Sequence, residues 1–164
     1  MIVKAKVVKL GDNVDTDAIL PGKYLALTDA AQLKEHAMEG ISPGFASKLV
    51  DTIIVAGENF GQGSSREHAP IALKAAGVRC LIAKSFARIF YRNAINIGLP
   101  ALECPEILTE VKDGDQLSLD LESGEVKNLS TGMTATVEPI PRNVLDILND
   151  GGVIEHLRRK RARH

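Results

Sequence analysis

Two serines and an arginine follow a glycine-rich turn in the segment GENFGQGSSREHAP (57–70). An apolar run typical of a buried strand precedes this segment, and a stretch of helical composition follows it. In α/β sheets, ligands bind at such a position, outside the carboxyl end of a strand. The glycines let the backbone turn tightly, while helix-start N–H groups, the hydroxyls of Ser64 and Ser65, and the guanidinium of Arg66 suit an anion. The sequence therefore predicts a site for a small carboxylate or phosphate.

Helix capping is the alternative interpretation of part of this segment. Ser64-x-x-Glu67 matches a capping box, in which the serine accepts from the Glu67 amide and Glu67 reaches back. Capping explains neither the three glycines nor Ser65 and Arg66. Pro70 also complicates a helix capped at Ser64, because its ring would fall inside the helix and remove a hydrogen bond to the Arg66 carbonyl.

Other phosphate and hydrolase motifs fit less well. A P-loop needs a lysine before the hydroxyl residue, and a nucleophile elbow needs glycine where Glu67 stands. His68 could pair with Ser64 as in a hydrolase, but residues four apart at a helix start share a face without necessarily forming a hydrogen bond. We therefore keep the anion site as the main interpretation of this segment.

A second polar segment, DNVDTDAILPGKYL (12–25), carries Asp12, Asp15 and Asp17. It lacks the glycine and the closing glutamate of an EF-hand calcium loop, so Asx-turns in a surface loop are the favoured interpretation. The four histidines of the chain show no metal-ligand spacing. We predict no metal site in this chain.

The composition indicates one soluble α/β domain spanning residues 1–164, with 45% apolar and 25% charged residues. Five of the 20 positive side chains lie in a basic tail, 158–164, which leaves a net charge of −6 on residues 1–157. An acidic body of this kind argues against nucleic-acid binding. The tail is predicted to be a solvated helix end, and contact with a partner is the alternative.

Cysteine usage and the N-terminus indicate a cytoplasmic protein. Cys80 lies in an apolar run and Cys104 stands alone, so we expect both thiols to be reduced. Two cysteines without a CxxC motif cannot hold a four-iron cluster unaided. The N-terminus alternates like a strand rather than like a signal peptide, and no apolar run is long enough to span a membrane.

Periodicity predicts a βαβ core of parallel strands followed by a C-terminal antiparallel β meander beside it. The expected strands are 2–10, 51–57, 79–84, 99–102, 116–121, 125–129 and 133–138. The expected helices are 29–39, 65–76, one capped by Ser85 with an apolar face of Phe86, Ile89, Phe90, Ala94 and Ile97, one after Pro141, and a basic one after Gly151-Gly152. The aspartate-rich segment after the first strand is expected to be a loop.

Three segments of the chain together resemble the small subunits of the 3-isopropylmalate dehydratase and homoaconitase family, within the aconitase superfamily. These segments are NVDTDAILPGKYL, GENFGQGSSREHAPIALKAAG and AKSFARIFYRNAINIGLP. The resemblance covers nearly the whole chain and implies a swivelling β/β/α domain that caps a large subunit carrying a [4Fe-4S] cluster, in a heterodimer or heterotetramer. It implies a hydro-lyase that interconverts 2- and 3-isopropylmalate by dehydration and rehydration in leucine biosynthesis.

The resemblance also implies roles for matching residues. Ser64 would be the catalytic base, an alkoxide that removes a carbon-bound proton while the partner's iron takes up the leaving hydroxyl. Helix-start N–H groups and the charge of Arg66 would lower the pKa of Ser64. Ser65 and Arg66 would hold a substrate carboxylate, and Asp17 would orient polar groups at the shared site.

The loop after Pro21 bears on which dicarboxylate is used. Family members that take a second distal carboxylate have an arginine after a Tyr-Leu pair, whereas here Tyr24-Leu25 is followed by Ala26 and Leu27. An apolar Leu25-Ala26-Leu27 surface suits a branched alkyl group and disfavours an unpaired carboxylate. Lys23 could substitute for the missing guanidinium. The alternatives are a homoaconitase or other methylmalate-type hydratase small subunit, or a module that only binds an anion.

Overall fold

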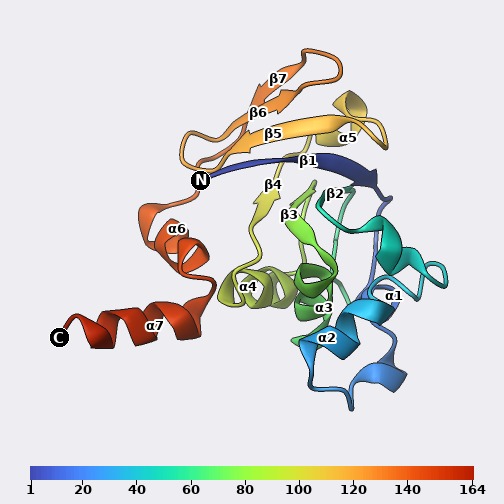
Figure 1. Cartoon of the computed structure of the whole chain (residues 1–164). Coiled ribbons are helices and arrows are strands. Elements are labelled where there is room, and N and C mark those ends of the chain that lie inside the picture. The colour runs from blue at the N-terminus through green and yellow to red at the C-terminus, as the bar shows by residue number, and fades with distance from the viewer.

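A curled seven-stranded sheet organises the computed structural model, which describes residues 1–164 (Figure 1). The strands are β1 (Ile2–Lys9), β2 (Thr52–Ala56), β3 (Val78–Ala83), β4 (Ala101–Glu103), β5 (Gln116–Asp120), β6 (Glu125–Asn128) and β7 (Thr134–Thr136). Their order across the sheet is β4-β3-β2-β1-β5-β6-β7. The first four strands pair in parallel, and β5 to β7 continue the sheet with antiparallel pairs.

Five α-helices and three 3₁₀ turns lie between these strands in the chain, and two more helices follow β7. The helices are α1 (Thr16–Ile19), α2 (Ala30–Leu33), α3 (His68–Ala76), α4 (Arg88–Asn96), α5 (Ile107–Glu110), α6 (Arg142–Asn149) and α7 (Val153–Ala162). The 3₁₀ turns are Gly22–Tyr24, Lys34–His36 and Phe45–Lys48. No helix is long and apolar enough to cross a membrane.

The predicted α/β class and the seven predicted strands are confirmed. The three C-terminal strands, however, extend the same sheet rather than packing beside it. They join it because the edge of β1 that faces away from β2 is free, and β5 pairs with it in antiparallel register, with Ala5 opposite Leu117. One sheet therefore carries both the βαβ core and the meander.

The central strands β2 and β3 are buried on both faces of the sheet. Along β2, Ile54 and Ala56 enter one hydrophobic cluster, while Ile53 and Val55 enter the other. The first cluster lies under α3 and α4, and the second lies between the sheet and α6. Because both faces of these strands are covered, their sequences are nearly continuous apolar runs and do not alternate between apolar and polar residues.

Two helix predictions near the N-terminus need correction. The segment predicted as a loop contains α1, whose first turn is capped by the Asp15 carboxylate accepting from the Ala18 amide at 2.7 Å. The helix predicted over 29–39 narrows to α2 and a 3₁₀ turn. The 3₁₀ turn ends at His36, because Ala37 leaves the helical conformation with ψ 129° and Met38 then takes a left-handed one with φ +61°.

The starts of the two central helices also differ from the prediction. Helix α3 begins at His68, so Ser64 is not its cap, and Pro70 falls in the first turn where a missing N–H has no cost. Ser85 does not cap α4 either, because its Oγ accepts from the Asn59 amide at 2.9 Å. Ile89, predicted on the apolar face, is 57% exposed.

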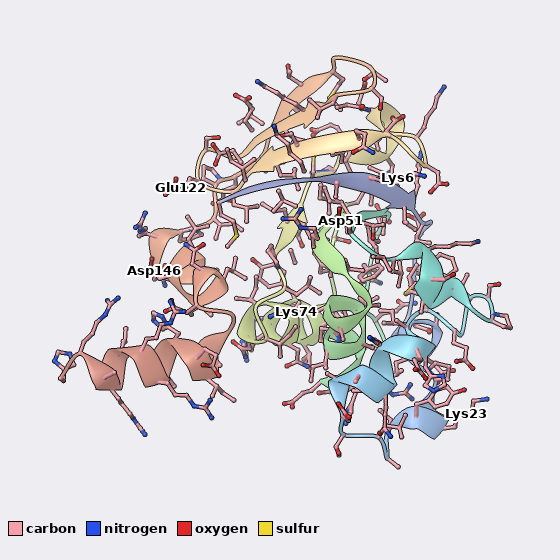
Figure 2. All side chains as sticks on the ribbon, viewed as in Figure 1. Lys6, Lys23, Asp51, Lys74, Glu122 and Asp146 are labelled. Carbon is pink, nitrogen blue, oxygen red and sulfur yellow. The ribbon has the colours of Figure 1, made fainter.

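The C-terminal helices confirm the prediction of a helix, a double-glycine break and a basic helix. Lys74 of α3, labelled in Figure 2, ties this region to the core. Its Nζ donates to the carbonyl of Ile97, at the end of α4, at 2.8 Å and to the carbonyl of Gly151 at 3.4 Å. From that point α7 extends away from the body of the molecule (Figure 1).

The central strand β2 provides a stability test. Ile54 is 1% exposed, so we expect Ile54→Ala to lower the free energy of unfolding by about 2–5 kcal/mol, because it leaves a cavity. Ile2→Ala is the matched control on β1, where the side chain is 60% exposed, and it should cost under about 1 kcal/mol. Urea unfolding of both variants measures the difference, and equal losses would contradict this description of the core.

Candidate active site at the carboxyl ends of β1 and β2

The loops that follow β1 and β2 are joined by backbone hydrogen bonds. The Gly61 amide donates to the carbonyl of Val14 at 2.7 Å, and the Thr16 amide donates to the carbonyl of Gln62 at 2.8 Å. Because β1 and β2 are parallel neighbours, their carboxyl ends meet at one edge of the sheet. The two polar segments singled out in the sequence therefore form one site, although about 50 residues separate them in the chain.

Two glycines of the loop are required by their neighbours in the fold. Gly61 has φ +84°, and a Cβ there would lie 2.2 Å from the ring of Phe90. Gly63 has φ +106°, and a Cβ there would lie 3.1 Å from Oγ1 of Thr16. These glycines therefore allow a close approach to the backbone. The groups that approach it are the side chains of Phe90 and Thr16, whereas the sequence predicted a ligand.

A cavity of about 540 Å³ opens at this edge, between the loops and α4. Its polar lining includes Thr16, Ser64, Ser65, Arg66, Arg88 and Arg92. Ser64 and Ser65 are exposed. Because both serines and Arg66 line the same cavity, the structure brings these three predicted residues together.

Arg88 and Arg92 are two lining residues that the sequence analysis missed. They lie one turn apart on the exposed face of α4, and neither forms an ion pair with an acidic side chain. Their spacing of four residues in KSFARIFYR was a usable signal, because residues four apart share a helix face. With Arg66 they make the cavity strongly cationic.

The guanidinium of Arg66 is held from one side only. Its Nη1 donates to Oδ1 of Asp17 at 3.0 Å and to the carbonyl of Leu20 at 3.1 Å. Its Nε is buried and has no hydrogen-bond partner. A buried donor without a partner costs about 1–3 kcal/mol, so the guanidinium is incompletely satisfied within this chain.

Asp17 orients Arg66 in this arrangement. Its Oδ1 also accepts from the Gly22 amide at 3.0 Å. The hydrogen bond from Arg66, followed by that from Gly22, holds the pKa of Asp17 below its usual range. The carboxylate therefore stays ionised and fixes Nη1, which leaves the Nε side of the guanidinium free.

Ser64 lies beside a second hydroxyl rather than at a helix start. Its Oγ is 3.5 Å from Oγ1 of Thr16. Because α3 begins only at His68, the predicted contribution of helix-start N–H groups at Ser64 is wrong. The charge of Arg66 and the hydroxyl of Thr16 are the features that remain near this oxygen.

The segment Tyr24–Leu27 lies beside the cavity but does not line it. The hydroxyl of Tyr24 donates to Oε1 of Glu39 at 2.5 Å, and its ring stacks on His36 with centroids 3.7 Å apart. Leu25 and Leu27 are partly buried against the first hydrophobic cluster, and only Ala26 is exposed among the three residues after Tyr24. Gly22, just before this segment, connects it to Arg66 through Asp17.

The metal-binding potential of the chain is low. No group of three or more His, Cys, Asp or Glu side chains is placed to hold a metal ion. Cys80 and Cys104 are free and buried, and burial raises the pKa of the Cys80 thiol to about 12. A thiol of this kind does not supply the thiolate that an iron–sulfur cluster needs, so these residues do not fit one.

The fold and the site define a domain of the aconitase type. The model of the aconitase C-terminal domain matches residues 43–107, which include β2, the glycine-rich loop, α3, β3 and α4. The crystal structure of 3-isopropylmalate dehydratase (leuD) from Methanocaldococcus jannaschii superposes with a TM-score of 0.92 and 46% identity, covering 99% of this chain and 96% of that one.

Curated relatives narrow the family further. The isopropylmalate/citramalate isomerase small subunit of M. jannaschii is 52% identical, over 98% of this chain and 96% of its own length. The 3-isopropylmalate dehydratase small subunit of Halothermothrix orenii is 52% identical, over 96% of each chain. The chain belongs to the family of 3-isopropylmalate dehydratase small subunits, as the resemblance predicted.

The pairing of Asp17 with Arg66 predicts an unusual titration. Because the pKa of Asp17 is lowered in the folded state, the pairing stabilises the fold above the ordinary aspartate value of about 4. This stabilisation is lost as the pH falls through the lowered folded-state pKa. Carboxyl-carbon NMR should show Asp17 titrating below the ordinary value, and Arg66→Gln should return it toward that value. An ordinary titration of Asp17 in the unmodified chain would contradict the pairing.

Proposed function

We propose that this chain is the small subunit of a hydro-lyase that interconverts 2- and 3-isopropylmalate by dehydration and rehydration. The observation that carries the proposal is the cavity that Ser64, Ser65 and Arg66 line together, with the guanidinium of Arg66 fixed by Asp17. A substrate carboxylate pairs with Arg66 in this cavity. The sequence relationship to 3-isopropylmalate dehydratase small subunits supports the same reaction.

Three side chains of this chain share the work in this proposal. Arg66 binds a carboxylate of the substrate through the side of the guanidinium that Asp17 leaves free, and the Ser65 hydroxyl donates to the same carboxylate. Ser64, as the alkoxide, takes the carbon-bound proton during dehydration and returns a proton during rehydration. The positive charge of Arg66 favours the charged form of Ser64.

The site is proposed to be completed by a large subunit that carries a [4Fe-4S] cluster. The cysteines here do not fit a cluster, and the cavity is open, with Ser64 and Ser65 exposed at its rim. The names of the relatives, each a small subunit, support a second chain. The buried, free thiols support a cytoplasmic location, where such thiols stay reduced.

The proposed substrate preference rests on the segment after Tyr24. Leu25 and Leu27 are anchored in the first hydrophobic cluster, and the exposed residue between them is Ala26 rather than a cation. Because the residues after Tyr24 present no cation beside the cavity, a distal carboxylate would lack a partner on this side, whereas an isopropyl group needs none. This favours isopropylmalate over homoaconitate.

The half-site proposal is tested by assaying the chain alone and with its cluster-loaded large subunit, anaerobically. We expect turnover of 2-isopropylmalate only in the mixture. Ser64→Ala should lower kcat by about 10²–10⁴-fold, the usual contribution of a positioned base. Ser47→Ala, an exposed serine whose Oγ donates to the carbonyl of Gly44, is the control and should have no effect. Unchanged turnover by Ser64→Ala would overturn the role of Ser64, and tight dicarboxylate binding by an inactive mixture would favour an anion-binding module.

Substrate preference is tested at Ala26. Ala26→Arg should raise kcat/KM for homoaconitate relative to 2-isopropylmalate by about tenfold, because a guanidinium near the cavity pairs with the distal carboxylate. Ala26→Gln adds a side chain of comparable length without the charge and should leave the ratio nearly unchanged. A wild-type preference for homoaconitate, or equal effects of the two variants, would contradict the specificity argument.

A further inference from the structure

We infer that Thr16 is a positioning residue for Ser64, whose oxygen it holds and stabilises by donating a hydrogen bond from its own hydroxyl. This inference rests on the proposed function, in which the Ser64 oxygen acts as the base. It assigns a task to a residue of the aspartate-rich segment that the sequence analysis left without one.

The first support is the isolation of the Thr16 hydroxyl. Thr16 is 3% exposed, and its Oγ1 has one hydrogen-bond partner, Oγ of Ser64 at 3.5 Å. Thr52 is equally buried at 3%, but its hydroxyl donates to the carbonyl of Leu49 at 2.8 Å, within the fold. Of these two buried threonines, only Thr16 turns its hydroxyl toward a residue that lines the cavity.

The second support is the way the fold fixes this hydroxyl. The Thr16 amide donates to the carbonyl of Gln62, and Asp15 caps the helical turn that Thr16 begins. Gly63 leaves the space that Oγ1 of Thr16 occupies, since a Cβ at residue 63 would lie 3.1 Å from that atom. A β-branched side chain has few rotamers, so a fixed backbone also fixes the hydroxyl.

The chemistry of a serine base explains why a donor belongs there. A hydrogen bond to the charged form of a group favours that form and lowers its pKa, and such a bond is shorter and stronger than one between neutral groups. At 3.5 Å the contact is long, as catalytic hydrogen bonds are before the substrate complex forms. Because α3 starts four residues beyond Ser64, Thr16 supplies the donor that the helix start does not.

The test compares variants of Thr16 in the complex with the large subunit. Thr16→Val keeps the shape and removes the hydroxyl. It should lower kcat about tenfold at neutral pH and move the rising limb of the kcat–pH profile about one unit higher, because the pKa of the base rises. KM and the affinity for the large subunit should stay unchanged. Thr16→Ser should retain both the rate and the profile, and Thr52→Val is the matched control, expected to change neither.

Thr16→Ala is a second variant in case valine disturbs the turn, and it should show the same displaced profile. Circular dichroism of each variant checks that the chain is folded. An unshifted profile in Thr16→Val or Thr16→Ala, or equal losses in Thr16→Val and Thr52→Val, would overturn the inference. Ser64→Ala separates the two levels: wild-type activity there defeats the proposed function, whereas an inactive Ser64→Ala beside an unshifted Thr16→Val defeats only the role of Thr16.

Discussion

Parallel pairing of β1 with β2 is the constraint on which the site depends. The pairing sets Lys6 beside Thr52 and Lys9 beside Val55, so both strands end at the same edge of the sheet. The loops beyond them then continue side by side through backbone hydrogen bonds between residues 13–16 and 58–62. Hydroxyls, a carboxylate and a guanidinium that are distant in the chain become neighbours because the backbone, rather than their own contacts, places them.

The polar contacts at the site direct groups more than they stabilise the fold. The Asp17 side chain is 69% exposed, and an ion pair with so much water around it adds little to the stability of the fold. What the pair achieves is direction, since it fixes Nη1 of Arg66, a residue that lines the cavity. Stability comes instead from the two hydrophobic clusters on the faces of the sheet.

Features set by local pattern could be predicted from the sequence, and features set by tertiary contact could not. The strands followed from apolar periodicity, and the glycine-rich turn with Ser64, Ser65 and Arg66 was predicted at the edge of the sheet where the structure has a cavity lined by these residues. The alternative interpretation of Ser64 as a helix cap is wrong, because α3 starts at His68 and Oγ of Ser64 lies 3.5 Å from Oγ1 of Thr16 across the loops. No local pattern could show that contact, since it depends on the strand pairing.

Tertiary contacts also determine the positions of the residues that the sequence did not place correctly. Arg88 reaches the cavity only because α4 packs along the loop, with the ring of Phe90 against Gly61. Tyr24 was expected at the substrate, but its hydroxyl donates to the carboxylate of Glu39, 15 residues further along the chain. Sequence propensity depends only on residue type, whereas the contacts of these side chains depend on which groups the tertiary structure places beside them.

The arrangement also accounts for an active site divided between two chains. In the free domain, the buried and unpaired Nε of Arg66 costs free energy. The exposed hydroxyls of Ser64 and Ser65 add little to the stability of the fold. They become useful when a second surface closes the cavity, because excluding water strengthens every charge interaction inside it. In the proposed function, the Ser64 base therefore reaches its low pKa only when the large subunit covers the cavity, which would confine proton abstraction to the complete complex.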